Sequence, residues 1–94
     1  MASTDAQRRE VYYSGRVQGV GFRYTARSIA QGFAVTGFVK NLRDGRVQIV
    51  VEGATTQVQA MLSDIRATMG RYITGVEEIS GPPTGRFSNF EVRF

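Results

Sequence analysis

The sequence predicts an α+β fold in which two helices pack on one face of a mainly antiparallel sheet. Three observations lead to this prediction. Several short segments alternate apolar with polar residues, which is the period-two pattern of strands with one buried face. Two other segments space their apolar residues by three and four, as amphipathic helices do. The segments follow one another in the order β-α-β-β-α-β, with one more short strand at the C-terminus.

The first strand and the first helix fall in the N-terminal third of the chain. Residues 11–17 place valine and tyrosine side chains on one side of a strand. From Phe22 the spacing changes, because Phe22, Ala26 and Ile29 recur at the intervals of a single helical face. Gly32 is placed to end this helix.

A hairpin follows the first helix. Residues 34–42 and 46–53 have the composition of strands, and Asp44-Gly45 between them supplies the backbone freedom that a tight turn needs. We therefore expect the two strands to pair antiparallel. The second strand has one clear core-facing row, formed by Val47, Ile49 and Val51.

The C-terminal half should contain a second helix and two strands. Thr55 or Thr56 can cap this helix, which should end near Gly70. Its apolar residues recur at i, i+3, i+4 and i+7, namely Val58, Met61, Leu62 and Ile65. Residues 74–80 should form a strand, residues 81–85 a loop and residues 90–94 a short edge strand. This order is the ferredoxin-like, or split β-α-β, arrangement.

Length and composition set the domain organisation. With 94 residues, of which 41% are hydrophobic, the chain can bury one core but not two. We expect residues 1–8 to be a flexible tail and residues 9–94 to be the domain. The chain has no cysteine, which excludes disulfides and thiolate chemistry, and no apolar run of membrane-spanning length. These features predict a cytoplasmic protein without a membrane partner.

The ionisable residues narrow the possible chemistry. Twelve basic and eight acidic residues leave a formal charge of +4, which favours anionic partners without specifying them. There is no histidine, so the commonest general base and the commonest metal ligand are missing. The neighbours Glu77 and Glu78 should point to opposite faces of a strand, where they are poor joint ligands. We therefore expect no metal and no cofactor.

One segment has the composition of a phosphate-binding loop. Gly15–Arg23 contains three glycines and no proline, so every residue keeps an N–H that can be aimed at an anion near a helix start. Its spacing matches neither nucleotide-binding P-loops nor dinucleotide folds. Arg23 follows at the start of the helix, where its planar guanidinium can contact two phosphate oxygens. The alternative is a tight β-to-α turn followed by a solvated arginine.

A second segment ends in an asparagine at the close of a strand. The carboxamide of Asn41 offers both a donor and an acceptor, so it can hold a water in one orientation. Asparagine at this position is also a common turn former. Taken alone, Asn41 is compatible with either role.

Together the two segments closely resemble the signatures of the acylphosphatase family, G-x-V-Q-G-V-x-F-R and G-x-V-x-N-x-x-D-G-x-V. The first is matched by Gly15, Val17, Gln18, Gly19, Val20, Phe22 and Arg23. The second is matched by Gly37, Val39, Asn41, Asp44, Gly45 and Val47. The resemblance runs from about Val11 to Phe94.

The resemblance implies a function and a set of site residues. The substrate would be a small-molecule acyl phosphate, and inorganic phosphate or sulfate would bind as product or analogue. Arg23 and the backbone amides of Gln18, Gly19, Val20, Gly21 and Phe22 would hold the phosphoryl group. Asn41 would orient the attacking water, without a metal. We expect the protein to be a monomer.

Two other functions are compatible with the same order of elements. RNA-recognition domains share it, but they stack bases on aromatic residues of central strands, and residues 46–53 contain no aromatic residue. We therefore do not expect a nucleic-acid partner. A catalytically silent phosphate-binding domain is the second alternative, which turnover of benzoyl phosphate would exclude.

Overall fold

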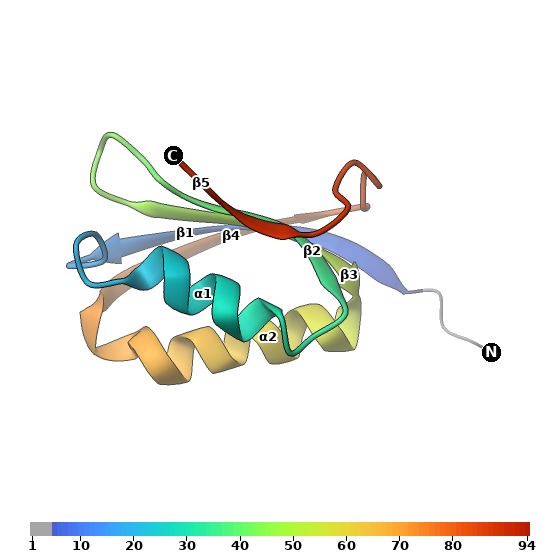
Figure 1. Cartoon of the computed structure of the whole chain (residues 1–94), viewed down its shortest axis with the longest axis horizontal. Coiled ribbons are helices and arrows are strands. Elements are labelled where there is room, and N and C mark those ends of the chain that lie inside the picture. Colours follow the sequence, from blue (N-terminus) through green and yellow to red (C-terminus); the bar gives the residue numbers. More distant parts are fainter. Residues whose placement is uncertain (1–4) are drawn as a thin grey trace.

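The computed structural model describes residues 5–94, which form one five-stranded sheet with two helices packed on one of its faces (Figure 1). The elements are β1 (Ala6–Gly15), α1 (Phe22–Ala30), β2 (Val35–Asn41), β3 (Val47–Ala54), α2 (Thr55–Met69), the short 3₁₀ helix η1 (Gly70–Tyr72), β4 (Ile73–Gly81) and β5 (Phe90–Arg93). No helix in this part of the chain is long and apolar enough to cross a membrane.

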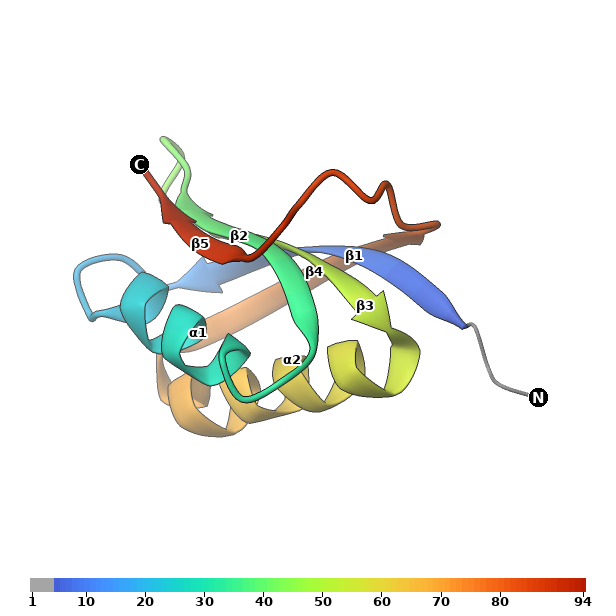
Figure 2. The same cartoon turned by 45° about the vertical axis from the view of Figure 1, so that its right-hand side comes forward.

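The strand order confirms the predicted fold. The sheet runs β4-β1-β3-β2-β5, in which β1 pairs antiparallel with β3 and β4, and β2 pairs antiparallel with β3. The added C-terminal strand β5 lies parallel to β2 at the edge of the sheet (Figure 2). The architecture is therefore the ferredoxin-like arrangement with one extra edge strand.

The core lies between the sheet and the two helices. The predicted row of β3 is fully buried, and it packs with the buried face of β1 and with both helices. The buried residues of α2 are the predicted Val58, Met61, Leu62 and Ile65, together with Met69. Burying one side of each element against the other layer supplies most of the stabilisation of a domain of this size.

Two local predictions are wrong. The first strand begins at Ala6 and pairs with β3 from its first residue, so residues 6–8 belong to the sheet and not to a tail. Their side chains are polar and gave no apolar alternation. The helix α2 has no side-chain cap, because its N-cap position falls on Ala54 and Thr55 is already the first helical residue, where its hydroxyl donates to the carbonyl of Asp5. The expected tail at residues 1–4 lies outside the described residues.

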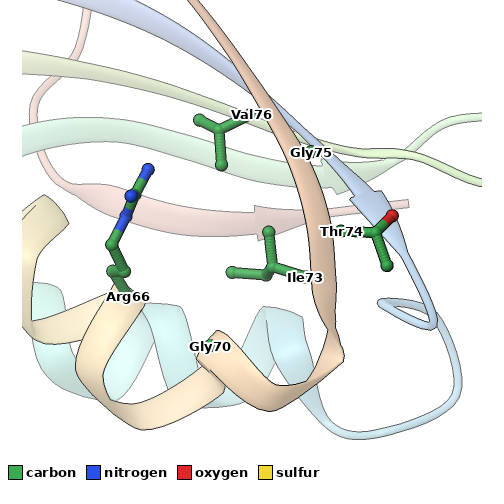
Figure 3. Close-up of a pocket in the computed structure, with 6 residues that line it drawn as sticks. All are labelled: Arg66, Gly70, Ile73, Thr74, Gly75 and Val76. Atoms are coloured by element: carbon green, nitrogen blue, oxygen red, sulfur yellow. The ribbon is translucent and has the colours of Figure 1, made fainter.

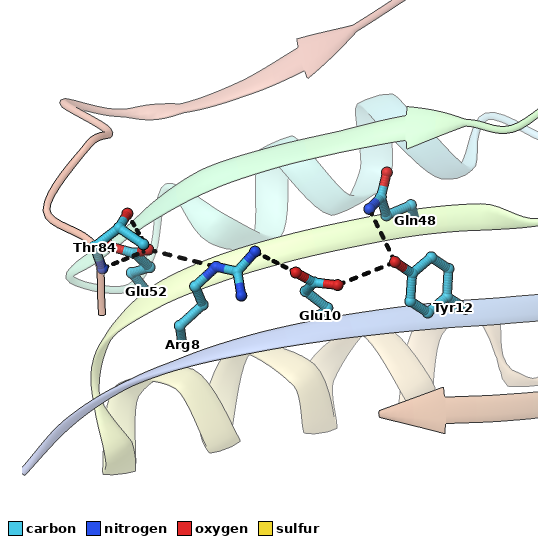
Figure 4. Close-up of polar contacts among 6 residues, drawn as sticks. All are labelled: Arg8, Glu10, Tyr12, Gln48, Glu52 and Thr84. Atoms are coloured by element: carbon cyan, nitrogen blue, oxygen red, sulfur yellow. Dashed lines mark hydrogen bonds and ion pairs between the residues drawn. The ribbon is translucent and has the colours of Figure 1, made fainter. Parts of the chain in front are cut away.

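The face of the sheet opposite the helices carries a row of polar side chains. Arg8 pairs with Glu10, whose other carboxylate oxygen accepts a hydrogen bond from the Tyr12 hydroxyl (Figure 4). Gln48 on β3 in turn donates to that hydroxyl oxygen at 3.2 Å. Burial, followed by the hydrogen bond to Glu10, raises the pKa of Tyr12. These contacts join β1 to β3 across the sheet.

A buried carboxylate holds the loop that leads to β5. Glu52 is only 4% exposed and accepts hydrogen bonds from the Thr84 N–H at 2.9 Å, the Thr84 hydroxyl at 2.7 Å and the Gly85 N–H at 3.0 Å (Figure 4). Arg8 Nε lies 3.7 Å from the same carboxylate. Burial acts to raise the pKa of Glu52, but these hydrogen bonds and the Arg8 charge outweigh it, so the pKa is lowered.

Candidate active site

The loop between β1 and α1 lies at one end of the molecule, beside the β2–β3 hairpin and the C-terminus (Figures 1 and 2). The loop is fastened at its start, where the Arg16 N–H donates to the carbonyl of Tyr72 at 2.9 Å. Asn41 is the last residue of β2, and Arg93 is the last residue of β5. Pairing of β3 with both β1 and β2, and of β5 with β2, therefore brings three distant parts of the sequence to this end.

Two glycines give the loop its shape. Gly19 and Gly21 have φ angles of +80° and +78°, which side chains with a Cβ rarely adopt. Gly21 is also the N-cap of α1, and the first helical bond runs from the Thr25 N–H to the Gly21 carbonyl. Within residues 5–94, no backbone carbonyl accepts a hydrogen bond from the N–H groups of residues 18–24. A set of unpaired donors at a helix start suits an anion.

These groups surround a pocket of about 170 Å³. Its lining consists of Val17, Gly19, Gly21, Phe22, Arg23, Tyr24 and Asn41. Of the residues predicted for the site, the pocket thus brings together Gly19, Gly21, Phe22, Arg23 and Asn41. Gln18 and Val20 are not among the residues that line it.

The guanidinium of Arg23 is oriented by the C-terminal segment. One terminal nitrogen, Nη1, lies 3.5 Å from the carbonyl oxygen of Arg93, and the Phe94 ring lies 4.7 Å from the guanidinium carbon. In the described part of the chain, no carboxylate pairs with Arg23. Its positive charge is therefore not neutralised by an ion pair at the edge of the pocket.

Asn41 reaches the pocket because it continues the core-facing row of β2. Gly37 and Val39 precede it on that side of the strand and are buried. The Oδ1 atom of Asn41 is itself buried, and it has no hydrogen-bond partner among the described residues. A buried acceptor without a hydrogen bond lowers the stability of the protein. The Asn41 oxygen is therefore suited to accept a hydrogen bond from a donor that enters the pocket with a ligand.

Gln18 and Val20 occupy other positions. The Gln18 carboxamide donates from Nε2 to the carbonyls of Leu42 at 2.8 Å and Arg46 at 3.0 Å. The Gln18 side chain therefore connects the loop between β1 and α1 to the hairpin that follows Asn41. Val20 is half-buried and packs against the core. The motif contained Gln18, but no signal in the sequence identified the two carbonyls as its partners.

Larger hollows lie elsewhere on the surface, with other linings. One of about 360 Å³ lies between the end of α2 and β4, where Arg66 is its only charged residue (Figure 3). The rest of its lining is glycine, threonine and aliphatic side chains, and Thr74 points to the other side of the strand (Figure 3). Another, of about 650 Å³ beside Tyr12, contains Arg46 and two glutamates. Neither hollow combines unpaired amides with a carboxamide.

The fold and the pocket together define a ferredoxin-like α+β protein with a loop shaped to bind an anion at the start of its first helix. A family model for acylphosphatases matches residues 9–92. The chain is 43% identical over 91 residues to the acylphosphatase of Synechococcus sp. (strain JA-2-3B'a(2-13)), an alignment that covers 96% of both chains. It belongs to the acylphosphatase family and is a hydrolase of that type.

Solved structures agree with this assignment. The crystal structure of the acylphosphatase from Bacillus subtilis is 27% identical and superposes with a TM-score of 0.84, covering 94% of this chain and 99% of that one. Full-length HypF in its phosphate- and nucleotide-bound form matches at 26% identity and a TM-score of 0.81. The match covers 95% of this chain but only 12% of HypF. Family and fold support hydrolysis of acyl phosphates.

Proposed function

We propose that this protein hydrolyses acyl phosphates by direct attack of a water that Asn41 positions, while Arg23 and the loop amides hold the phosphoryl group. The products are a carboxylate and inorganic phosphate. The observation that carries this proposal is the pocket itself, in which a cation without an acidic partner, unpaired N–H groups and an unpaired carboxamide oxygen converge.

The phosphoryl group fits the donors of the loop. Its oxygens accept hydrogen bonds, and Gly19, Gly21, Phe22 and Arg23, which line the pocket, can offer backbone N–H groups and a guanidinium as donors. Because these donors are fixed before substrate arrives, little reorganisation is needed when charge develops on the phosphoryl oxygens. The dipole of α1 adds a favourable contribution, since the pocket lies at its N-terminus.

The attacking water fits Asn41. The Oδ1 atom accepts a hydrogen bond from the water, which leaves a lone pair of the water oxygen free to attack phosphorus. The carboxylate of an acyl phosphate is a good leaving group, so positioning and charge stabilisation account for the reaction without a strong base. The side chains of the pocket include no histidine, cysteine or carboxylate, in keeping with direct attack by water.

The nucleic-acid alternative is weakened by the opposite face of the sheet. Aromatic rings of β1 and β2 on that face already contact arginine side chains. The guanidinium of Arg46 lies 4.8 Å from the Tyr12 ring, and that of Arg93 lies 4.1 Å from the Phe38 ring. Stacking of bases would require these contacts to open.

The deciding experiment is turnover of benzoyl phosphate by the purified protein in excess chelator. We expect release of one phosphate per substrate at a rate that the chelator does not change, and competitive inhibition by inorganic phosphate. A protein that binds phosphate without turning over any acyl phosphate would instead be a silent binding domain. The expected monomeric state and cytoplasmic location stay predictions.

A further inference from the structure

The phosphoryl pocket is small for a complete substrate. It measures about 170 Å³, whereas pockets that enclose a whole organic ligand have volumes of about 300–1,000 Å³. If the phosphoryl group and the attacking water occupy this volume, the acyl group has to lie at the mouth of the pocket. The residues at the mouth then decide which acyl groups bind well.

Tyr24 lies at this mouth. It is the third residue of α1, it lines the pocket, and its side chain is 59% exposed. Side chains on a helix lean toward its N-terminus, which here is the loop that holds the phosphoryl group. Among the described residues, the ring forms no ring stack, cation–π contact or hydrogen bond. An exposed aromatic side chain without such a partner has a free face.

The other residues that line the pocket do not compete for this role, and the exposed Phe94 ring, which is not among them, already contacts the Arg23 guanidinium. Arg23 and Asn41 are assigned to the phosphoryl group and the water, and Val17 and Phe22 are buried in the core. The lining contains no carboxylate and no lysine. An acyl group that projects from the pocket therefore meets an aromatic surface rather than a charged one.

We propose that the Tyr24 ring is the surface on which the acyl group packs, so that this enzyme favours aromatic and large apolar acyl phosphates over acetyl phosphate. This inference rests on the proposed function. The contact is present in the ground state and in the transition state alike, because the acyl group stays in place while the bond to phosphorus breaks. Such uniform binding lowers KM and leaves kcat nearly unchanged.

The test compares Tyr24→Ala and Tyr24→Phe with two substrates, benzoyl phosphate and acetyl phosphate. For Tyr24→Ala we expect KM for benzoyl phosphate to rise about five- to tenfold with kcat nearly unchanged, as loss of one aromatic contact predicts. KM for acetyl phosphate should change less than about twofold, because the acetyl group is too small to cover the ring. Tyr24→Phe keeps the ring and should behave as the parent protein.

Two controls separate this effect from damage to the site. Inhibition by inorganic phosphate should be unchanged in Tyr24→Ala, because phosphate has no acyl group. Ile79→Ala removes another exposed apolar side chain, 56% exposed on the distant edge strand β4, and should leave both KM values unchanged.

The outcomes are distinguishable. A rise in KM for benzoyl phosphate alone supports the inference. An equal rise for both substrates, or no change for either, overturns it and leaves the proposed function standing. Absence of turnover of both substrates by the parent protein overturns the proposed function and this inference with it.

Discussion

Arg23 is positioned by its neighbours without being neutralised by them. The Arg93 carbonyl and the Phe94 ring contact its guanidinium, and neither carries a negative charge at the point of contact. The full charge is therefore available to an anion, which in the proposed mechanism is the phosphoryl group. A fork of two N–H donors held in this way also fixes the angle of approach, which a point charge does not.

Arg23→Lys should separate charge from geometry. Lysine keeps the charge but loses the fork and the flat surface against Phe94. We expect kcat/KM for benzoyl phosphate to fall about 10²- to 10³-fold, and Arg23→Ala should lose inhibition by phosphate as well. The matched control is Arg27→Lys, an exposed arginine one turn further along α1, which should keep parent kinetics. Near-parent activity in Arg23→Lys would show that charge alone is sufficient.

Asn41 should affect turnover more than phosphate affinity. In Asn41→Ala the water loses its acceptor while the loop donors remain, so we expect kcat to fall about 10²- to 10³-fold and the inhibition constant of phosphate to change only a few-fold. Asn41→Asp has nearly the same shape but adds a negative charge, and should weaken phosphate binding too. Steady-state kinetics with phosphate as inhibitor measures both effects. Full turnover by Asn41→Ala would contradict the water-positioning role.

At the scale of elements, the site depends on one contact between segments far apart in sequence. The loop after β1 carries the N–H groups that we propose as phosphate donors, and β2 carries Asn41. Gln18 connects them by donating to the carbonyls of Leu42 and Arg46 across the hairpin. In the proposed mechanism, the position of the water relative to phosphorus would therefore depend on a side chain that does not line the pocket.

Gln18→Ala should loosen this connection. Each of the two lost hydrogen bonds contributes about 0.5–1.5 kcal/mol, so we expect the free energy of unfolding to fall by about 1–3 kcal/mol and kcat by about tenfold. Gln18→Glu keeps the size of the side chain but places a carboxylate against two carbonyl oxygens. It should lose at least as much stability and turnover as Gln18→Ala. Urea denaturation and kinetics on both variants provide the measurement. Parent kinetics in Gln18→Glu would show that the connection has no role in catalysis.

The elements that could be predicted are those whose apolar residues face the core. The period of two in β3 and the helical spacing in α2 identified both correctly, because burial of one face selects these patterns. The start of β1 was missed because Arg8 and Glu10 satisfy each other on the open face of the sheet. Arg23 and Asn41 could be named from their motifs, but their common pocket depends on strand register, which the sequence does not show.

At the scale of the whole molecule, one buried carboxylate supports the path of the C-terminal segment. β4 and β5 lie at opposite edges of the sheet, so the chain between them must cross the intervening strands. Glu52 on the central strand β3 holds this crossing segment through Thr84 and Gly85. β5 then runs beside β2 and brings the Arg93 carbonyl to Arg23. Loss of the Glu52 contacts should therefore disturb the crossing segment and, through β5, the position of the Arg93 carbonyl beside Arg23.

The charge of Glu52 should make this support dependent on pH. Its pKa in the folded protein lies below the ordinary value of 4.5, so near that pH the unfolded chain binds more protons than the folded one. The stabilisation is then complete above about pH 4.5 and is lost as the pH falls through the lower, folded-state pKa. Glu52→Gln keeps the shape but lacks the charge that accepts hydrogen bonds from Thr84 and Gly85. We expect it to lower the free energy of unfolding by about 1–3 kcal/mol at pH 7.

The decisive result is how this difference changes with pH in urea denaturation. The parent protein and Glu52→Gln should converge as the pH is lowered from 7 toward 3, because protonation of Glu52 makes the parent resemble the variant. The control is Glu91→Gln, at a half-exposed carboxylate on β5. It should lower the free energy of unfolding by less than about 1 kcal/mol at pH 7, because exposed ion pairs contribute little. If Glu52→Gln instead stays a constant amount below the parent at every pH, its cost comes from packing, and the carboxylate charge does not hold the crossing segment in place.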